Sequence, residues 1–203
     1  MQIKKEEVKH AIIEAAFEEF KNFGFEQSSI RRIVKAAGTT IGNFYNYFEN
    51  KEMLFDNIVR ETYMRLMHFA ENHNDIEAVD DLWSVQDISK WRAALSKQIS
   101  TLVPMISDAF IILMEGSKGT KYENTREELA QILAIHFTEH VDQFNPEYAS
   151  KDFGIVLATQ LISSIVDIIK RFTEDDVRVR LIVEELLFFI VGIMTLLLPE
   201  KGQ

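Results

Sequence analysis

The sequence contains no cysteine and few residues that interrupt helices. Its 203 residues include only 3 prolines and 8 glycines. The absence of cysteine excludes disulfides and thiolate metal sites, and it fits a reducing compartment. The scarcity of proline and glycine, with little alternation of apolar and polar residues, favours long helices over sheet. We therefore expect an all-α protein.

The chain also lacks a stretch that predicts a membrane span or a secretory signal. Its most apolar run, residues 186–198, is shorter than the roughly 18 residues that a spanning helix needs. Two carboxylates, Glu184 and Glu185, come directly before this run. The opening segment MQIKKEEVKH has charges but no apolar core after them. We expect a cytoplasmic protein with no membrane partner.

Positive charge is scarce overall but concentrated in one short segment. The net charge is −10, yet residues 27–51 carry four basic side chains against the single acidic Glu49. These basic residues are Arg31, Arg32, Lys35 and Lys51. A small basic segment on an acidic chain suits a local contact with a polyanion such as DNA, because the rest of the chain is repelled and the contact is oriented.

Apolar periodicity and end signals predict a series of helices. Gly24 and Gly38 are suitable stops, and Ser28, Thr39 or Thr40, and Asn50 are suitable N-caps. The expected helices cover residues 4–23, a short stretch after Ser28, a second short stretch to about Tyr45, 51–72, 88–103, 104–115, 122–144, 151–172 and 176–198.

Three short helices joined by tight turns within about fifty residues have the layout of a helix-turn-helix, whose second short helix enters the major groove. Here that helix carries Asn43, which has the groups for a bidentate contact with adenine, and Thr40, which can contact a base edge. The alternative interpretation is a solvated face, since polar residues on a short helix are common.

The segment GFEQSSIRRIVKAAGTTIGNFYNYFENKEMLF, residues 24–55, resembles the N-terminal signature of the TetR family of regulators. The ordered matches are Gly24-Phe25, Ser28-Ser29, Ile30, Ile33, Ala37-Gly38, Gly42, Phe44-Tyr45, Tyr47-Phe48, Lys51-Glu52 and Leu54. The resemblance covers residues 4–55. It implies a DNA-binding transcriptional regulator, and we expect a ligand-responsive repressor that binds a palindromic operator as a homodimer.

The resemblance also assigns roles to residues of the reading segment. Ser28, Tyr45, Tyr47 and Lys51 would contact phosphates, and Ser29 suits the same role. Thr39, Thr40, Asn43 and Asn46 would lie nearest the bases, with Gly42 letting the backbone approach the DNA. Two residues depart from the family pattern. Ile41 replaces a basic or polar residue and suits a thymine methyl, and Glu49 adds a carboxylate that faces DNA unfavourably.

The expected organisation has two domains. Residues 1–50 form the helix-turn-helix domain, residues 51–203 form a larger helical ligand-binding and dimerisation domain, and the helix 51–72 connects them. The helices 151–172 and 176–198 are so rich in apolar residues that we expect burial in a core, an interface or both. The resemblance implies a four-helix dimer interface, and a monomer with a large core is the alternative.

A ligand pocket is expected among the middle helices, where the family binds small effectors. The large candidate residues are Trp83, Trp91, Met105, Phe110, Met114, Phe137 and His140. Ordinary core packing is the alternative for each of them. The identity of the effector does not follow from the sequence, and no other cofactor is expected.

One pattern points to a different class of function. His136-Phe-Thr-Glu-His140 matches the H-x-x-E-H pattern of inverted zinc proteases, so a helical metal-binding hydrolase using His136, Glu139 and His140 is the alternative function. These residues fall on an apolar helix face, and no third ligand is evident downstream. We expect no metal and no enzyme activity. A helical interaction protein without DNA binding is a further alternative.

Overall fold

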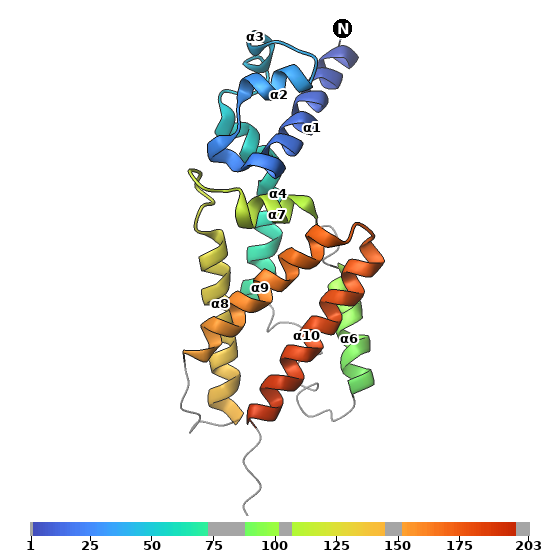
Figure 1. Cartoon of the computed structure of the whole chain (residues 1–203), viewed down its shortest axis with the longest axis vertical. Coiled ribbons are helices and arrows are strands. Elements are labelled where there is room, and N and C mark those ends of the chain that lie inside the picture. Colours follow the sequence, from blue (N-terminus) through green and yellow to red (C-terminus); the bar gives the residue numbers. More distant parts are fainter. Residues whose placement is uncertain (1, 73–87, 102–106, 145–151, 198–203) are drawn as a thin grey trace, which may run out of the picture. The chain divides into compact units, whose positions relative to one another are not determined.

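The computed structural model describes residues 2–72, 88–101, 107–144 and 152–197, and every regular element in these ranges is a helix (Figure 1). The expected all-α class is confirmed. The helices are α1 (Gln2–Gln27), α2 (Ile30–Ala36), α3 (Ile41–Phe44), α4 (Lys51–Asn72), α6 (Ile88–Thr101), α7 (Asp108–Glu115), α8 (Thr125–Phe144), α9 (Phe153–Arg171) and α10 (Asp175–Leu197).

The chain divides into two compact units. The N-terminal unit comprises Met1–Arg65 together with Ser107–Thr125, and the C-terminal unit comprises Leu66–Ile106 and Arg126–Gln203. Helix α7 therefore belongs with the first helices of the chain. The sequence suggests a boundary between a DNA-binding and a ligand-binding domain at residue 50. That boundary concerns function and stays a prediction, since the compact units of the structure have different bounds.

The N-terminal unit is built on the apolar face of α1. Ile12, Ala16 and Phe20 recur at intervals of four residues and are fully buried or nearly so. The ring of Phe20 meets the ring of Phe55 edge to face at 5.0 Å, which joins α1 to α4. Gly24 then breaks the helical path with a φ of 65°, a left-handed conformation that favours glycine, so the predicted end of the first helix is confirmed.

The short helices begin and end mostly as their local signals predict. Gly38 follows α2 with a φ of 64°, and the side chain of Thr40 accepts a hydrogen bond from the Asn43 amide at the start of α3. Asn50 accepts from the backbone amide of Met53 at 2.8 Å and so caps α4. The predicted cap of α2 is wrong, because Ser29 is the N-cap residue and the Ser28 hydroxyl donates to the carbonyl of Phe25 instead.

Two glycines bring the kink at Gly24 in α1 against the end of α7. The amide of Phe25 donates to the carbonyl of Gly116 at 2.7 Å. A Cβ added to Gly116 would lie 2.9 Å from the carbonyl oxygen of Ile112 and 3.4 Å from the Cα of Gly24, which is too close for a side chain. Lys21 on α1 and Asp108 on α7 add an ion pair at 2.5 Å. Close backbone contact thus fixes α7 to α1.

A buried carboxylate joins α4 to the segment that follows α7. Asp56 is 5% exposed and accepts from the Tyr122 hydroxyl at 2.6 Å and from the Lys121 ammonium at 2.6 Å. Arg60, one turn later on α4, pairs with its other oxygen. Burial acts to raise the pKa of Asp56, but the hydrogen bonds from Lys121, Tyr122 and Arg60 outweigh it and hold that pKa below its ordinary value. Tyr122 therefore lies in this contact, and α8 begins at Thr125 rather than at Tyr122 as the sequence suggested.

The C-terminal unit contains α9 and α10, which pack against each other, and α6, which packs beside α10 (Figure 1). Arg178 holds the turn between α9 and α10. Its guanidinium, on a residue only 8% exposed, donates to the carbonyls of Phe172 at 2.6 Å and Ile169 at 2.9 Å, the last orphan acceptors of α9. Gly154 lets α9 approach α8, because a Cβ there would lie 2.9 Å from the carbonyl oxygen of Ala134.

The exposed face of α9 is more polar than the apolar richness of this helix suggests. Leu161, Ile162, Val166 and Ile169 are buried, but the exposed positions are mainly polar and include Thr159, Gln160, Asp167, Lys170 and Arg171. By length and composition alone, α9 is the one described helix that could cross a membrane, a test that core helices also pass. Its amphipathic pattern is that of a helix with one face in a protein core.

We expect Asp56→Asn to lower the free energy of unfolding by about 1.5–3 kcal/mol, because charge-assisted hydrogen bonds to a buried group are lost. The loss should shrink in acid. A carboxyl whose folded pKa is depressed stabilises the fold above its unfolded pKa of about 3.9 and loses that contribution as the pH falls through the folded pKa. Urea unfolding at neutral pH and at successively lower pH measures both effects.

Asp167→Asn is the matched control for this substitution. Asp167 also pairs with an arginine four residues later, Arg171 at 2.7 Å, but its side chain is 55% exposed. An exposed pair of this kind contributes only about 0.3–0.5 kcal/mol. Equal losses from the two substitutions would contradict the structural role assigned to Asp56.

Candidate nucleic-acid interface

Helix α3 and its flanking residues present a polar and aromatic surface with one buried anchor. Phe44 is fully buried and meets Tyr45 edge to face at 5.3 Å. Around this anchor, Ile41 is 40% exposed and Tyr45 is 55% exposed, while Gly42 and Asn46 are also exposed. A Cβ added at Gly42 would meet no atom within 4 Å, so the backbone at this position is open to a close partner.

The polar residues that are predicted to lie nearest the DNA bases are joined to one another by hydrogen bonds. Asn43 is half-buried, and its side-chain amide donates to the hydroxyl of Thr39 at 2.8 Å. The side-chain amide of Asn46 donates to the carbonyl oxygen of Asn43 at 3.2 Å. Thr40 is exposed and uses its hydroxyl to cap α3. The structure thus brings all four predicted base-reading residues together.

The two serines before α2 are held by contacts inside the protein. Ser28 is 8% exposed, and its hydroxyl is already bonded to Phe25 at 2.6 Å. The backbone amide of Ser29 donates to the buried carboxylate of Glu19 at 2.8 Å. Glu19 therefore supplies the cap at the N-terminus of α2, a role that the sequence analysis missed because Glu19 lies on a different helix. The predicted phosphate contacts of the two serines stay predictions.

Glu19 also neutralises one of the four cations of the basic segment. Arg32 donates to the same carboxylate oxygen through Nε at 2.8 Å and pairs with it through its terminal nitrogen at 2.5 Å. The hydrogen bond that Arg32 donates to Glu19 raises the pKa of Arg32 above its ordinary value. The guanidinium also lies 4.7 Å from the centre of the Phe23 ring. Arg32 thus belongs to the joint between α1 and α2.

The ammonium group of Lys51 also points to internal partners. It donates to the carbonyls of Phe25 at 2.6 Å and Ser28 at 3.1 Å, and it lies 4.2 Å from the centre of the Phe25 ring. Burial lowers the pKa of Lys51 below its ordinary value. Because an ammonium has three N–H donors, one remains for a phosphate, and the predicted DNA contact of Lys51 stays a prediction.

Two cations of the basic segment have no such internal contact, and the sequence analysis counted them in that segment without assigning them a role. Arg31 and Lys35 are four residues apart on α2, are exposed, and have no ion-pair partner among the described residues. Their spacing puts them on the side of α2 away from the buried Ile33 and Val34. That spacing was the signal in the sequence that pointed to this pair. Tyr47, predicted to contact a phosphate, is half-buried.

The predicted ligand-pocket residues that the structure describes belong to two different units. Phe110 and Met114 are buried on α7 in the core of the N-terminal unit, whereas Phe137 is half-buried on α8 in the C-terminal unit. Trp83 and Met105 lie outside the described residues, and the side chains of Trp91 and His140 are not among those described. The predicted pocket stays a prediction.

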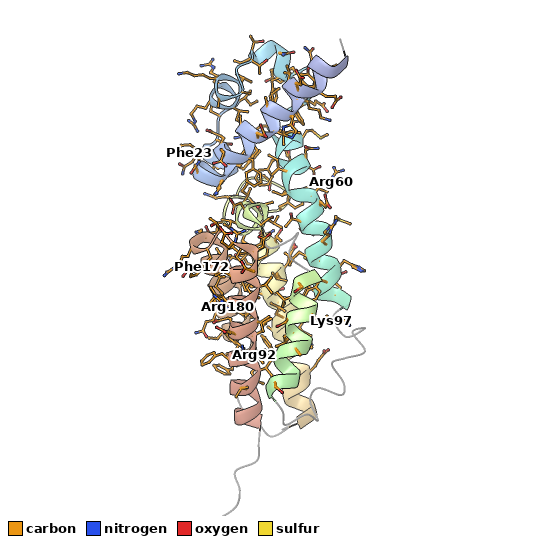
Figure 2. The ribbon with its side chains drawn as sticks, turned by 90° about the vertical axis from the view of Figure 1, so that its right-hand side faces the viewer. Phe23, Arg60, Arg92, Lys97, Phe172 and Arg180 are labelled. Atoms are coloured by element: carbon orange, nitrogen blue, oxygen red, sulfur yellow. The ribbon has the colours of Figure 1, made fainter. Side chains whose placement is uncertain are left out.

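A groove of about 510 Å³ lies between α6 and α10, and none of the predicted pocket residues lines it. Val179 and Val183 supply apolar lining, and Arg92 pairs with Glu184 across the two helices at 3.5 Å. Arg180 is a further cation of this lining (Figure 2). As for the H-x-x-E-H pattern, no group of three or more metal-ligating side chains occurs within the described part of the chain.

Comparison with known proteins matches the reading segment. Residues 12–58 match the family model described as bacterial regulatory proteins, tetR family. The uncharacterized HTH-type transcriptional regulator YdgC of Bacillus subtilis is 33% identical over 72 residues, which is 36% of this chain and 37% of that protein. The HTH-type transcriptional repressor AcnR of Corynebacterium glutamicum is 28% identical over 93 residues, which is 44% of this chain and 50% of that protein. The chain thus spans half or less of the length of these curated relatives.

A solved structure extends the similarity of fold to nearly the whole chain. The crystal structure of a gamma-butyrolactone receptor (ArpA like protein) has a TM-score of 0.57 and 18% identity, and the match covers 96% of each chain. At this identity the match shows the fold alone. These relatives are described as regulators or receptors, and the metal-dependent hydrolase is not favoured.

The internal contacts of Lys51 predict a stability effect that an ordinary surface lysine would not show. We expect Lys51→Met to lower the free energy of unfolding by about 1 kcal/mol, because two carbonyls lose their donor. Lys35→Met is the matched control and should change the stability by less than about 0.5 kcal/mol, since Lys35 is exposed. Urea unfolding of both variants measures the difference. A similar effect of both substitutions would show that Lys51 has no special role in the fold.

Proposed function

We propose that this chain is a regulator of the TetR family, whose model matches residues 12–58, and that it binds operator DNA and represses transcription in the cytoplasm. The observation that carries the proposal is the surface of α2 and α3. The exposed Ile41 lies on α3, the exposed Tyr45 and Asn46 directly follow it, and the cations Arg31 and Lys35 on α2 have no ion-pair partner among the described residues. Such a surface combines groups for base edges with charges for phosphates.

Within this proposal, Thr39, Thr40, Asn43 and Asn46 form the polar part of the base-reading surface, with Ile41 against a thymine methyl and Gly42 where the backbone approaches DNA. Tyr45, Tyr47, Ser28, Ser29 and the remaining donor of Lys51 serve phosphates. Arg31 and Lys35 join this second group. The acidic remainder of the chain, which gives the net charge of −10, disfavours other orientations on DNA.

The proposal includes a homodimer formed through α9 and α10. Phe188 on α10 is 75% exposed and Val191 is 41% exposed, while Ile155 and Val156 on α9 are exposed by 39% and 46%. A Cβ added at Gly192, one turn after Phe188, would meet no atom within 4 Å. A large exposed ring beside an open glycine suits packing against a second copy of the same helix. A twofold dimer calls for a palindromic operator.

A small-molecule effector completes the proposal. Binding that favours one of two conformations of the dimer would change the spacing of its reading helices and release the operator. The proposed lining of the effector site consists of large side chains of the middle helices, namely Trp83, Trp91, Met105, Phe110, Met114, Phe137 and His140.

Selection of bound DNA from a random pool, using the full chain, tests the function directly. A palindromic consensus is the expected result, because it reports both sequence-specific binding and twofold symmetry. No enrichment of any sequence would favour the alternative of a helical interaction protein without DNA binding. Activity that depends on added zinc would favour the hydrolase.

We expect Arg31→Ala and Lys35→Ala each to weaken binding to all DNA sequences alike. If each residue neutralises one phosphate, the slope of log K against log salt concentration should become less steep by about 0.9 per substitution. Binding titrations at several salt concentrations measure this slope. Arg180→Ala is the control, because Arg180 is also exposed but lies on α10. An unchanged slope in both α2 variants would remove these residues from the interface.

We expect Phe188→Glu to convert the dimer into a monomer, since a charge would be buried at the proposed interface. Sedimentation at micromolar concentration should then show the 23.5 kDa single chain. Ile135→Glu on α8 is the matched control, because Ile135 is 60% exposed but lies outside the two proposed interface helices. A wild-type protein that already sediments as a single chain would rule the dimer out.

A further inference from the structure

Three side chains of the reading segment form a hydrogen-bond chain with one direction. The Asn46 side-chain amide donates to the Asn43 carbonyl oxygen at 3.2 Å, and the Asn43 side-chain amide donates to the Thr39 hydroxyl oxygen at 2.8 Å. The backbone amide of Asn43 donates in turn to the hydroxyl of Thr40 at 3.2 Å. Asn43 is the middle member: its side chain accepts from Asn46 and donates to Thr39, and its backbone carbonyl accepts from the backbone amide of Asn46 at 3.2 Å.

The direction of these hydrogen bonds determines which donors and acceptors remain free to bind a partner. A hydroxyl oxygen that accepts a hydrogen bond keeps its own proton to donate, so Thr39 is left as a donor. Asn46 uses one N–H internally, so its carbonyl oxygen is left as an acceptor together with its second N–H. Asn46 is exposed, whereas Asn43 is half-buried. The donors and acceptors left for a partner at the two ends of this hydrogen-bonded series therefore belong to Thr39 and Asn46.

We infer that Asn43 is a positioning residue, which orients the Thr39 hydroxyl and the Asn46 amide toward two different bases. This inference rests on the proposed DNA binding. The donor of Thr39 matches the acceptors that guanine, adenine N7 or thymine O4 present in the major groove, and the acceptor of Asn46 matches the amino group of adenine or cytosine. Contacts that hold both side chains before DNA arrives reduce the side-chain freedom lost on binding.

A positioning role and direct reading of a base by Asn43 predict different results when Asn43 is removed. They differ in the number of base pairs at which discrimination is lost. A residue that reads one base loses discrimination at one position when it is removed. A residue that orients two readers loses discrimination at two positions, and these are the same positions that the two readers affect singly. The DNA-binding strength common to all sequences should change little in either case.

The experiment uses the full chain and the operator obtained by selection from random DNA. Binding is measured to that operator and to each of its single-base-pair variants, for the wild type and for Thr39→Val, Asn46→Ala and Asn43→Ala. We expect Thr39→Val and Asn46→Ala each to reduce discrimination at one position about fivefold, the effect of one net hydrogen bond. Asn43→Ala should reduce discrimination at both of these positions.

Two further variants sharpen the test. The double variant of Asn43→Ala with Thr39→Val should lose no more at the Thr39 position than Thr39→Val alone, because the two residues act through one contact. Asn43→Asp keeps an acceptor for Asn46 but has no N–H for Thr39, so it should reduce discrimination at the Thr39 position only, with a uniform loss of affinity from its charge. Asn57→Ala, at an exposed position of α4, is the control that should change no position.

The outcomes separate this inference from the proposed function. Loss at a single position that neither Thr39→Val nor Asn46→Ala affects would mean that Asn43 reads a base itself, and it would overturn the inference while the proposed function stands. Additive losses in the double variant would overturn it in the same way. A wild-type chain that enriches no DNA sequence would overturn the proposed function, and the inference with it.

Discussion

The buried carboxylate of Asp56 is the contact on which the arrangement of the N-terminal unit depends. A charge that is nearly excluded from water is stable only when its oxygens are fully hydrogen-bonded, and Arg60, Lys121 and Tyr122 provide those donors. Two of these three residues come from the segment after α7, more than sixty residues from Asp56 in the sequence. This contact and the Gly24–Gly116 junction make α7 part of the unit that carries the reading helices.

The local features of the fold were predictable because each depends on neighbouring residues. Gly24 and Gly38 adopt positive φ where the sequence predicts helix ends, and Thr40 and Asn50 cap the helices that follow them. The features that were missed depend on residues distant in the chain. The sequence could not show that Glu19 would cap α2, because that contact requires α1 to lie against α2. The same reason explains Tyr122, which the periodicity assigns to a helix and the structure assigns to Asp56.

The sequence located the segment that the family model also matches, but it did not show which charges of that segment are held by internal contacts. The count of four cations treats Arg31, Arg32, Lys35 and Lys51 alike, whereas Glu19 pairs with Arg32 and two backbone carbonyls hold Lys51. Only the contacts made in the folded protein show which of these cations are available to bind phosphate. The two that remain, Arg31 and Lys35, are those whose spacing on α2 points them away from the core.

Apolar composition likewise predicts burial only when the geometry of the helix is included. Both α9 and α10 are rich in Ile, Leu, Val and Phe, but among the described side chains each exposes only two large apolar residues, Ile155 and Val156 on α9 and Phe188 and Val191 on α10, and most other exposed positions are polar. Phe188 is the most exposed of the four at 75%, so the proposed second copy of the chain would bury the largest apolar side chain there. The polar residues of α9 would then form the rim of the interface, where hydrogen bonds and ion pairs remain in contact with water and favour a defined register over additional affinity.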